Sequence, residues 1–220
     1  MIDIIIATSR TREEVKPQVE EIETNTPESH RIIATCQPLS AAKNRNFGLS
    51  FANSDLIVML DDDIIGFYSG WLTTFISFMQ EDKNIVLSSA RLLDKNGHCN
   101  NNMGMNVPVN ETYSEIKSSF VVKNIFYKRI TTACICFRKS KIRFDETFQG
   151  SGFEDTCFMN QISEKFNGMK FIVNNKCKLI HLNEMKGQGN KEIWEFNHTH
   201  YCKKYPWDTV AQNQKWWFHN

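Results

Sequence analysis

Apolar runs alternate with amphipathic segments along the first 93 residues. The runs are rich in β-branched and aliphatic residues, which predicts strands buried on both faces. These predicted strands span residues 2–7, 31–36, 56–60 and 85–93. The segments between them space apolar residues as helices do, at 15–24, 39–52 and 70–80. Strands that alternate with helices predict an α/β fold, with a mostly parallel central sheet flanked by helices.

The alternation ends after residue 93. Residues 94–106 are rich in Asn and Gly without periodicity, which predicts a surface loop. Short strand-like segments at 113–137 indicate a smaller, partly antiparallel portion. Later segments are predicted as a helix at 154–166, strands at 171–173 and 178–182, and a helix at 192–205 that Pro206 ends.

Three acids, Asp61, Asp62 and Asp63, directly follow the apolar run at 56–60. Ligands of open α/β sheets bind beyond the carboxyl ends of the strands. Adjacent carboxylates repel one another unless a cation or paired donors offset their charge. A solvated acidic turn is the alternative, but such turns seldom follow a core strand so abruptly. The pattern therefore favours a site for Mg²⁺ or Mn²⁺, ions that prefer oxygen ligands and also hold substrate phosphates.

Small hydroxyl residues and arginines follow the first predicted strand. Ser9 or Thr11 can cap the next helix, whose free N–H groups, with Arg10 and Arg12, can receive an anion. An ordinary capped helix with two solvated arginines explains the same residues. Both interpretations stay open from these residues alone.

Two further features have a structural explanation and a functional one. Glu154 and Asp155 open a helix, where the helix dipole alone favours carboxylates. His181 lies near the end of the last predicted strand, and a single histidine is more often structural than a metal ligand. Gly48 interrupts a helical pattern at a cost of roughly 1 kcal/mol relative to alanine, so we expect close packing against it.

Composition sets the broad class. With 220 residues, 41% hydrophobic residues and a net charge of +1, one globular domain is expected, and the charge argues against a dedicated nucleic-acid binder. The seven cysteines form no CxxC pair, so Cys134 and Cys136 are expected to be buried free thiols. We expect a cytoplasmic location, because there is neither a membrane-length apolar run nor a signal-peptide pattern.

Together these pieces resemble family 2-like glycosyltransferases of the GT-A fold, over residues 2–181. The motifs that carry the resemblance occur in the order of the family: the Arg-Asn-x-Gly helix at 42–49, the strand with its Asp-x-Asp motif at 55–63, the Phe-Asp-Glu and Glu-Asp stretches at 144–146 and 152–155, and His181. The resemblance implies a single Rossmann-like GT-A domain over 1–220. Its expected parts are a nucleotide-sugar half at 1–93, an acceptor and catalytic half at 94–182, and a C-terminal extension at 183–220.

The resemblance also implies a role for each site residue. Asp63 would bind the metal directly, Asp61 would contact ribose or a metal-bound water, and His181 would be a further ligand. Asp155 would be the general base that leads to inversion, and Glu154 would hold substrate hydroxyls or act as the alternative base. The residues expected to bind the donor are Thr8, Ser9, Arg10, Arg45, Asp61 and Asp62.

The expected activity is metal-dependent transfer of a sugar from a nucleoside diphosphate, with UDP favoured, to a hydroxyl of a glycan, a protein or modified DNA. The DNA alternative rests on Lys and Arg residues interleaved with aromatics between 117 and 144, where strands with solvated basic faces are the simpler interpretation. Nucleotidyl transfer is a weaker alternative, because residues 7–10 lack the glycine-rich loop that it normally uses. A non-catalytic nucleotide-sugar-binding module is the alternative outside enzymes.

Overall fold

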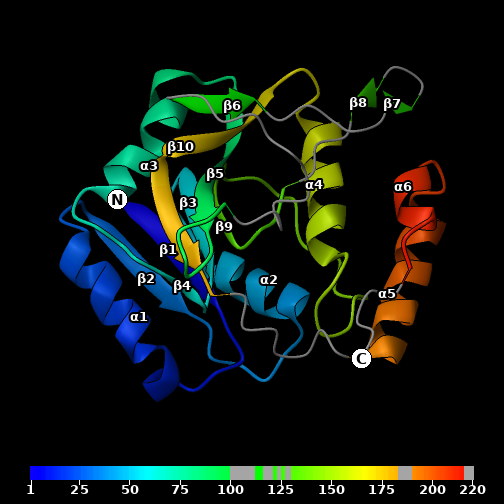
Figure 1. Ribbon diagram of the computed structural model, residues 1–220, viewed down its shortest axis with the longest axis horizontal. Coiled ribbons are helices and arrows are strands. Elements are labelled where there is room, and N and C mark those ends of the chain that lie inside the picture. The colour runs from blue at the N-terminus through cyan, green and yellow to red at the C-terminus, as the bar shows by residue number, and fades with distance from the viewer. Residues whose placement is uncertain (100–111, 116–120, 123–124, 127–129, 183–189, 216–220) are drawn as a thin grey trace.

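A mixed eight-stranded sheet lies at the centre of the computed structural model, which describes residues 1–99, 112–115, 121–122, 125–126, 130–182 and 190–215 (Figure 1). Its strands are β1 (Ile2–Ala7), β2 (His30–Ala34), β3 (Leu56–Asp61), β4 (Ile64–Ile65), β5 (Ile85–Leu93), β6 (Tyr113–Glu115), β9 (Cys134–Arg138) and β10 (Lys170–His181). The order is β2-β1-β3-β9-β5-β10-β4, and β6 pairs with β10. A separate hairpin joins β7 (Val121–Val122) to β8 (Ile125–Phe126).

The sheet is mostly parallel, as the sequence predicts. Strands β1, β2 and β3 are parallel, and so are β5 and β10. Strand β9 lies between these groups and runs antiparallel to both β3 and β5. The carboxyl ends of the five parallel strands therefore lie along one edge of the sheet, where the α/β rule expects ligands.

Helices cover both faces of the sheet. They are α1 (Arg12–Asn25), α2 (Ala41–Phe51), α3 (Trp71–Glu81), α4 (Glu154–Lys165), α5 (Lys191–Lys204) and α6 (Thr209–Gln212). Alternate residues of β3 serve two cores: Val58 and Leu60 pack with residues of α1 and α3, and Ile57 and Met59 pack with residues of α2 and α4. The prediction that residues 56–60 are buried on both faces is confirmed.

Gly48 of α2 packs against the sheet as expected. A Cβ atom there would lie 2.4 Å from Cγ2 of Ile5 and 3.3 Å from Cγ2 of Thr35. The missing side chain lets α2 approach β1 closely, which fixes the position of the Arg-Asn-x-Gly segment. Cys134 and Cys136 are buried and free, as predicted.

The structure corrects several local expectations. Residues 171–173 and 178–182 belong to one strand, β10, whose register shifts between Asn174 and Lys178. Helix α1 begins at Arg12, so Pro17 lies inside it and not in its first turn. Thr11 and not Ser9 caps α1, in a capping box with Glu14. The two-residue strand β4 has no counterpart in the predicted elements.

Some expectations fall on residues outside the described ranges. These are most of the predicted loop at 94–106, part of the basic and aromatic stretch at 117–144, and the end of the chain beyond 215. In the described part of the chain, no helix has the length and apolar character needed to span a bilayer.

Candidate active site

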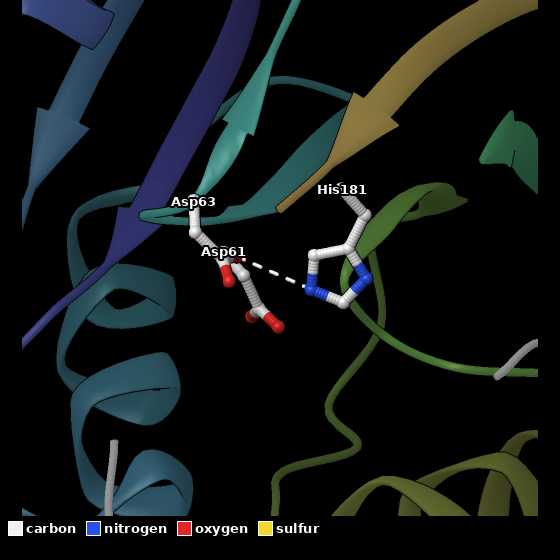
Figure 2. A group of neighbouring side chains, drawn as sticks. All are labelled: Asp61, Asp63 and His181. Carbon is white, nitrogen blue, oxygen red and sulfur yellow. Dashed lines mark ion pairs between the residues drawn. The ribbon is translucent and has the colours of Figure 1, made fainter. Parts of the chain in front are cut away.

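The acidic turn and His181 are brought together by β4. Strand β3 ends at Asp61, and β4 begins three residues later and pairs antiparallel with the end of β10, where His181 lies opposite Ile64. Ligand atoms of Asp61, Asp63 and His181 all lie within 4.8 Å of one another (Figure 2). This is the cluster that the resemblance implies for the metal.

Asp63 and His181 form the tighter part of this cluster. Asp63 Oδ1 lies 3.2 Å from His181 Nε2, and both side chains are largely buried. Burial of the imidazole lowers the pKa of His181, but the hydrogen bond and charge of Asp63 outweigh it, so the pKa is raised. Two carboxylates and an imidazole form a donor set that suits a divalent cation. A bound cation would relieve the repulsion between the carboxylates of Asp61 and Asp63. His181, which favours its charged form, offsets part of this repulsion.

Gln18 of α1 binds the backbone at both ends of the acidic turn. Its amide Nε2 donates to the carbonyl oxygens of Asp61 and Ile64, each at 2.9 Å. These two residues flank the turn, so one buried side chain fixes both of its ends. Within an amphipathic helix the sequence does not distinguish this glutamine from a surface residue.

Asp62 faces the first strand. Thr8 Oγ1 donates to Asp62 Oδ2 at 2.5 Å, and Arg10 Nε lies 3.2 Å from the same oxygen. Burial raises the pKa of Asp62, although the Thr8 hydrogen bond and the Arg10 charge oppose the rise. The structure thus brings together three of the residues predicted to bind the donor. Ser9 is exposed and takes no part in these contacts.

Arg45 links the acidic turn to the start of α4. Its guanidinium donates to Asp61 Oδ1 at 2.9 Å and to Glu154 Oε1 at 2.8 Å. The group is almost fully buried, and burial lowers its pKa, but Asp61 and Glu154 raise it further than burial lowers it. A permanently charged fork therefore holds two predicted site residues, from β3 and α4, in fixed relation.

Glu154 and Asp155 lie at the start of α4 in different environments. Glu154 is buried and accepts from Arg45 and, through Oε2, from the N–H of Gly152 at 2.5 Å. Asp155 accepts from the N–H of Thr156 at 2.7 Å. Burial and the neighbouring Glu154 raise the pKa of Asp155 to about 6, against the lowering effect of Arg45. A carboxyl group with a pKa near neutrality is suited to act as a general base.

Helix α5 fixes the loop that leads into this acid pair. The buried Asn197 accepts from the N–H of Gln149 at 2.9 Å and donates to the carbonyls of Gln149 and Gly152 at 2.7 and 3.1 Å. Phe153, which precedes Glu154, has a φ of 68° that favours glycine over a bulky residue. Asn197 therefore holds a strained turn beside the acids, and the sequence pattern contains no signal for this role.

The Phe-Asp-Glu stretch is also held from two sides. Asn46 of α2 pairs with both backbone groups of Phe144, at 2.8 and 2.9 Å. Asp145 binds His200 at 3.1 Å and Lys204 at 2.7 Å, both from α5. Burial raises the pKa of Asp145, but Lys204 and His200 lower it well below its usual range. Asp145 and Asn46 thus have structural partners that connect this stretch to the scaffold.

Comparisons with known proteins identify the family and the fold. The profile of glycosyl transferase family 2 matches residues 2–143. The crystal structure of GalNAc-T7 with UDP, GalNAc and Mn²⁺ superimposes with a TM-score of 0.61 at 9% identity, over 98% of this chain and 51% of that one. The structure of S. aureus TarS residues 1–349 gives a TM-score of 0.54 at 13% identity, over 91% of this chain and 65% of that one. No curated protein matches the sequence.

At these identities the two superpositions establish the fold. The chain spans about half of the first structure and just under two thirds of the second. The family assignment rests on the profile, which covers more than half of the chain and includes β1, α2 and the acidic turn. The chain therefore belongs to glycosyl transferase family 2 and has the GT-A fold.

Proposed function

We propose that this chain transfers a sugar from a UDP-sugar to a hydroxyl acceptor, with inversion at the sugar carbon and with Mn²⁺ or Mg²⁺ as cofactor. The observation that carries the proposal is the continuous set of contacts from Asp63 and His181, through Asp61 and Arg45, to Glu154, the residue directly before Asp155. UDP and Mn²⁺ are favoured because the GalNAc-T7 structure contains both.

The donor side consists of residues at the ends of β1 and β3. Asp61, Asp63 and His181 would hold the metal, whose chemistry when bound is to stabilise the charge on the departing diphosphate. Thr8 and Arg10 lie beside Asp62, so they are suited to orient the nucleotide phosphates and sugar next to that metal. Ser9 is exposed at the same turn and is available to the nucleotide.

The acceptor side consists of the start of α4. Asp155 would accept the proton of the acceptor hydroxyl, since its pKa of about 6 lets it be ionised yet basic near neutral pH. Glu154 is already bound to Arg45 and to Gly152, which suits it to position the turn and leaves Asp155 as the better base. A single displacement with the base on the acceptor side gives inversion.

A donor screen tests the proposal. Release of nucleoside diphosphate from a panel of nucleotide sugars is measured with Mn²⁺, with Mg²⁺ and with excess chelator, and candidate acceptors are then analysed by mass spectrometry. We expect release from a UDP-sugar that the chelator abolishes. Release that continues unchanged in chelator would remove the metal from the proposal, and no release from any donor would favour the non-catalytic binding module.

A modified-DNA acceptor is the second candidate, and one surface feature favours it. Lys139, Lys141, Arg143 and Lys165 are exposed and line a shallow hollow with Phe166. Basic side chains beside an aromatic ring can follow a phosphate backbone. DNA binding that weakens steeply with salt would support this acceptor, and no binding at low salt would exclude it.

A further inference from the structure

Two cations lie side by side in the sheet, and no acid among the described residues pairs with either of them. Arg91 of β5 and Lys178 of β10 are Cα partners in the parallel register. Their neighbours Leu92 and Leu179 share the core on the α1 and α3 face, so both cations lie on the opposite face. Like charges directly opposite each other destabilise a sheet. Among the described residues, neither cation forms an ion pair with a carboxylate, and this arrangement is costly unless something else offsets the charge.

Arg91 is the more unusual of the two. It is 8% exposed, its terminal amine donates to Cys99 Sγ at 3.1 Å, and its buried Nε has no partner in the described structure. An arginine does not relieve burial by losing its proton. The other buried arginine, Arg45, has two carboxylates. Within the described part of the chain Arg91 has only a weak thiol acceptor, so its guanidinium retains capacity for a bidentate oxyanion.

The sheet register places these cations relative to the candidate active site. Ile135 of β9 pairs with Met59 on one side and with Ser89 on the other. Asp61 follows Met59 by two residues, and Arg91 follows Ser89 by two residues. Their side chains therefore lie on the same face of the sheet and at the same height along the strands. One strand separates them, so their Cα atoms lie about 9–10 Å apart. The cations thus lie across β9 from Asp61, on the side away from Thr8 and Arg10.

We propose that Arg91 and Lys178 bind an anionic group, a phosphate or a carboxylate, carried by the acceptor. This inference rests on the proposed function, which places the donor at the ends of β1 and β3 and the acceptor at the start of α4, and it adds Arg91 and Lys178 to the residues that hold the acceptor. The site is otherwise rich in acids, which repel an anionic acceptor unless local cations hold it. A buried arginine beside an exposed lysine gives that group a fixed anchor and a mobile second contact.

Inorganic phosphate is the probe, measured by titration calorimetry without donor or metal. The measurements use an Arg10→Gln background, so that phosphate held on the donor side does not mask the second site. We expect Arg91→Met to weaken binding at least about tenfold, since charged hydrogen bonds contribute about that much, and Lys178→Gln to weaken it a few-fold. Lys176→Gln, at another exposed lysine of β10, is the matched control and retains the affinity. Equal phosphate affinity in Arg91→Met overturns the proposal.

A purely structural role for Arg91 makes a different prediction. If Arg91 mainly supports the turn at Cys99, then Arg91→Met lowers the unfolding temperature, and Cys99→Ala lowers it too. If Arg91 is an unpaired binding group, Arg91→Met keeps or raises the unfolding temperature while phosphate binding is lost. Cys99→Ala then leaves the phosphate affinity unchanged. A lowered unfolding temperature with unchanged phosphate affinity counts against the proposal.

Competition identifies the group on the acceptor. Glucose 6-phosphate and glucuronate are each titrated against bound phosphate, with glucose as the neutral control. The tighter Arg91-dependent competitor identifies phosphate or carboxylate, and failure of both contradicts the proposal. The assay contains no donor, so it is independent of turnover. Arg91-dependent binding without any donor turnover would retain the anion site and reject the transferase assignment, whereas turnover without such binding would do the reverse.

Discussion

The proposed donor side and the proposed acceptor side of the candidate active site are built in different ways. On the donor side, Thr8, Asp62 and Asp63 stand at or just beyond the ends of neighbouring parallel strands, and the sheet register brings them together. On the acceptor side, Glu154 and Asp155 follow a strained turn: Arg45 of α2 holds Glu154, and Asn197 of α5 holds the turn. The first side depends on the sheet, and the second depends on contacts between distant helices.

This difference predicts different responses to mutation. A donor-side change should remove binding or catalysis and leave the fold intact, because the strands already fix the backbone. An acceptor-side change should alter both catalysis and stability, because the same contacts do both. The following four variants test this contrast, from the largest expected effect to the smallest.

Asp63→Ala tests the donor side most directly. We expect a loss of donor hydrolysis and transfer of about 1,000-fold, the range seen when a main electrostatic contact of a transition state is removed. The unfolding temperature should change little, since β3 stays paired with β1 and β9, and β4 stays paired with β10. Metal binding by calorimetry and diphosphate release are the measurements. Asp55→Ala, at an exposed acid before β3, is the control. Normal metal affinity in Asp63→Ala would contradict its role as a ligand.

Arg45→Gln tests the connection between the two sides. It leaves Glu154 and Asp61 without their shared cation, and removing one partner of a buried ion pair typically costs about 3 kcal/mol or more. Chemical denaturation measures this cost. Arg31→Gln is the control, because its partner Asp3 keeps hydrogen bonds from the N–H groups of Asn53 and Ser54. We expect a cost of about 1 kcal/mol there. Equal losses in both variants would show that Arg45 is not the stronger connection.

The pH dependence tests Asp155. The pKa of about 6 means that the base form is lost as pH falls through 6, so transfer should decrease about tenfold per pH unit below it. A raised carboxyl pKa also means that the folded state binds the proton more tightly than the unfolded state does. Asp155 therefore makes the metal-free protein less stable as pH rises from 3.8 to about 6.

Asp155→Asn should remove both effects. The free energy of unfolding is measured against pH for both proteins without metal. The difference between the two curves gives the contribution of Asp155, because the other acids are common to both. The transfer rate of the variant should be low at every pH. If the transfer rate of the variant still decreased in the same way below pH 6, another group would be the base, with Glu154 as the first candidate.

Asn197→Ala should have the smallest effect. It removes four hydrogen bonds to the loop at 149–152, one of them long, and we expect a loss of about 1–2 kcal/mol in the free energy of unfolding. The turnover number should fall several-fold while donor affinity is retained, because only the acceptor side loosens. Thr199→Ala, at an exposed position of α5, is the control. If donor affinity fell as much as turnover did, the two sides would not respond differently to mutation, and the contrast would be wrong.

The sequence predicted the acidic turn and the strand end that faces it, because the signals for both are local. An apolar run followed by three acids identifies both β3 and the turn after it, and the hydroxyl and arginine residues after β1 mark the facing strand end. The prediction failed at β4, because two residues cannot show a periodicity. That short strand is nonetheless what brings His181 to Asp63. The family resemblance implied this pairing, but the residue pattern did not.

The acceptor side was harder to predict because its contacts cross the chain. Arg45 and Glu154 are 109 residues apart. Asn197 lies in the helix predicted at 192–205, where the sequence pattern does not distinguish a buried amide from a solvated one. Partners of this kind depend on which helices pack together, and single-sequence patterns do not contain that information.

The position of β9 has a consequence for how the chain folds. Strands β3 and β5 do not pair with each other. Each pairs with β9, which the ribosome synthesises after both of them. During synthesis the first 93 residues can form only a three-stranded sheet and an unattached strand. Joining them requires closure of a long loop, and such distant pairings slow folding and extend the time for which strand edges are open. Molecular chaperones that shield these edges on the ribosome should therefore increase the yield of the folded protein.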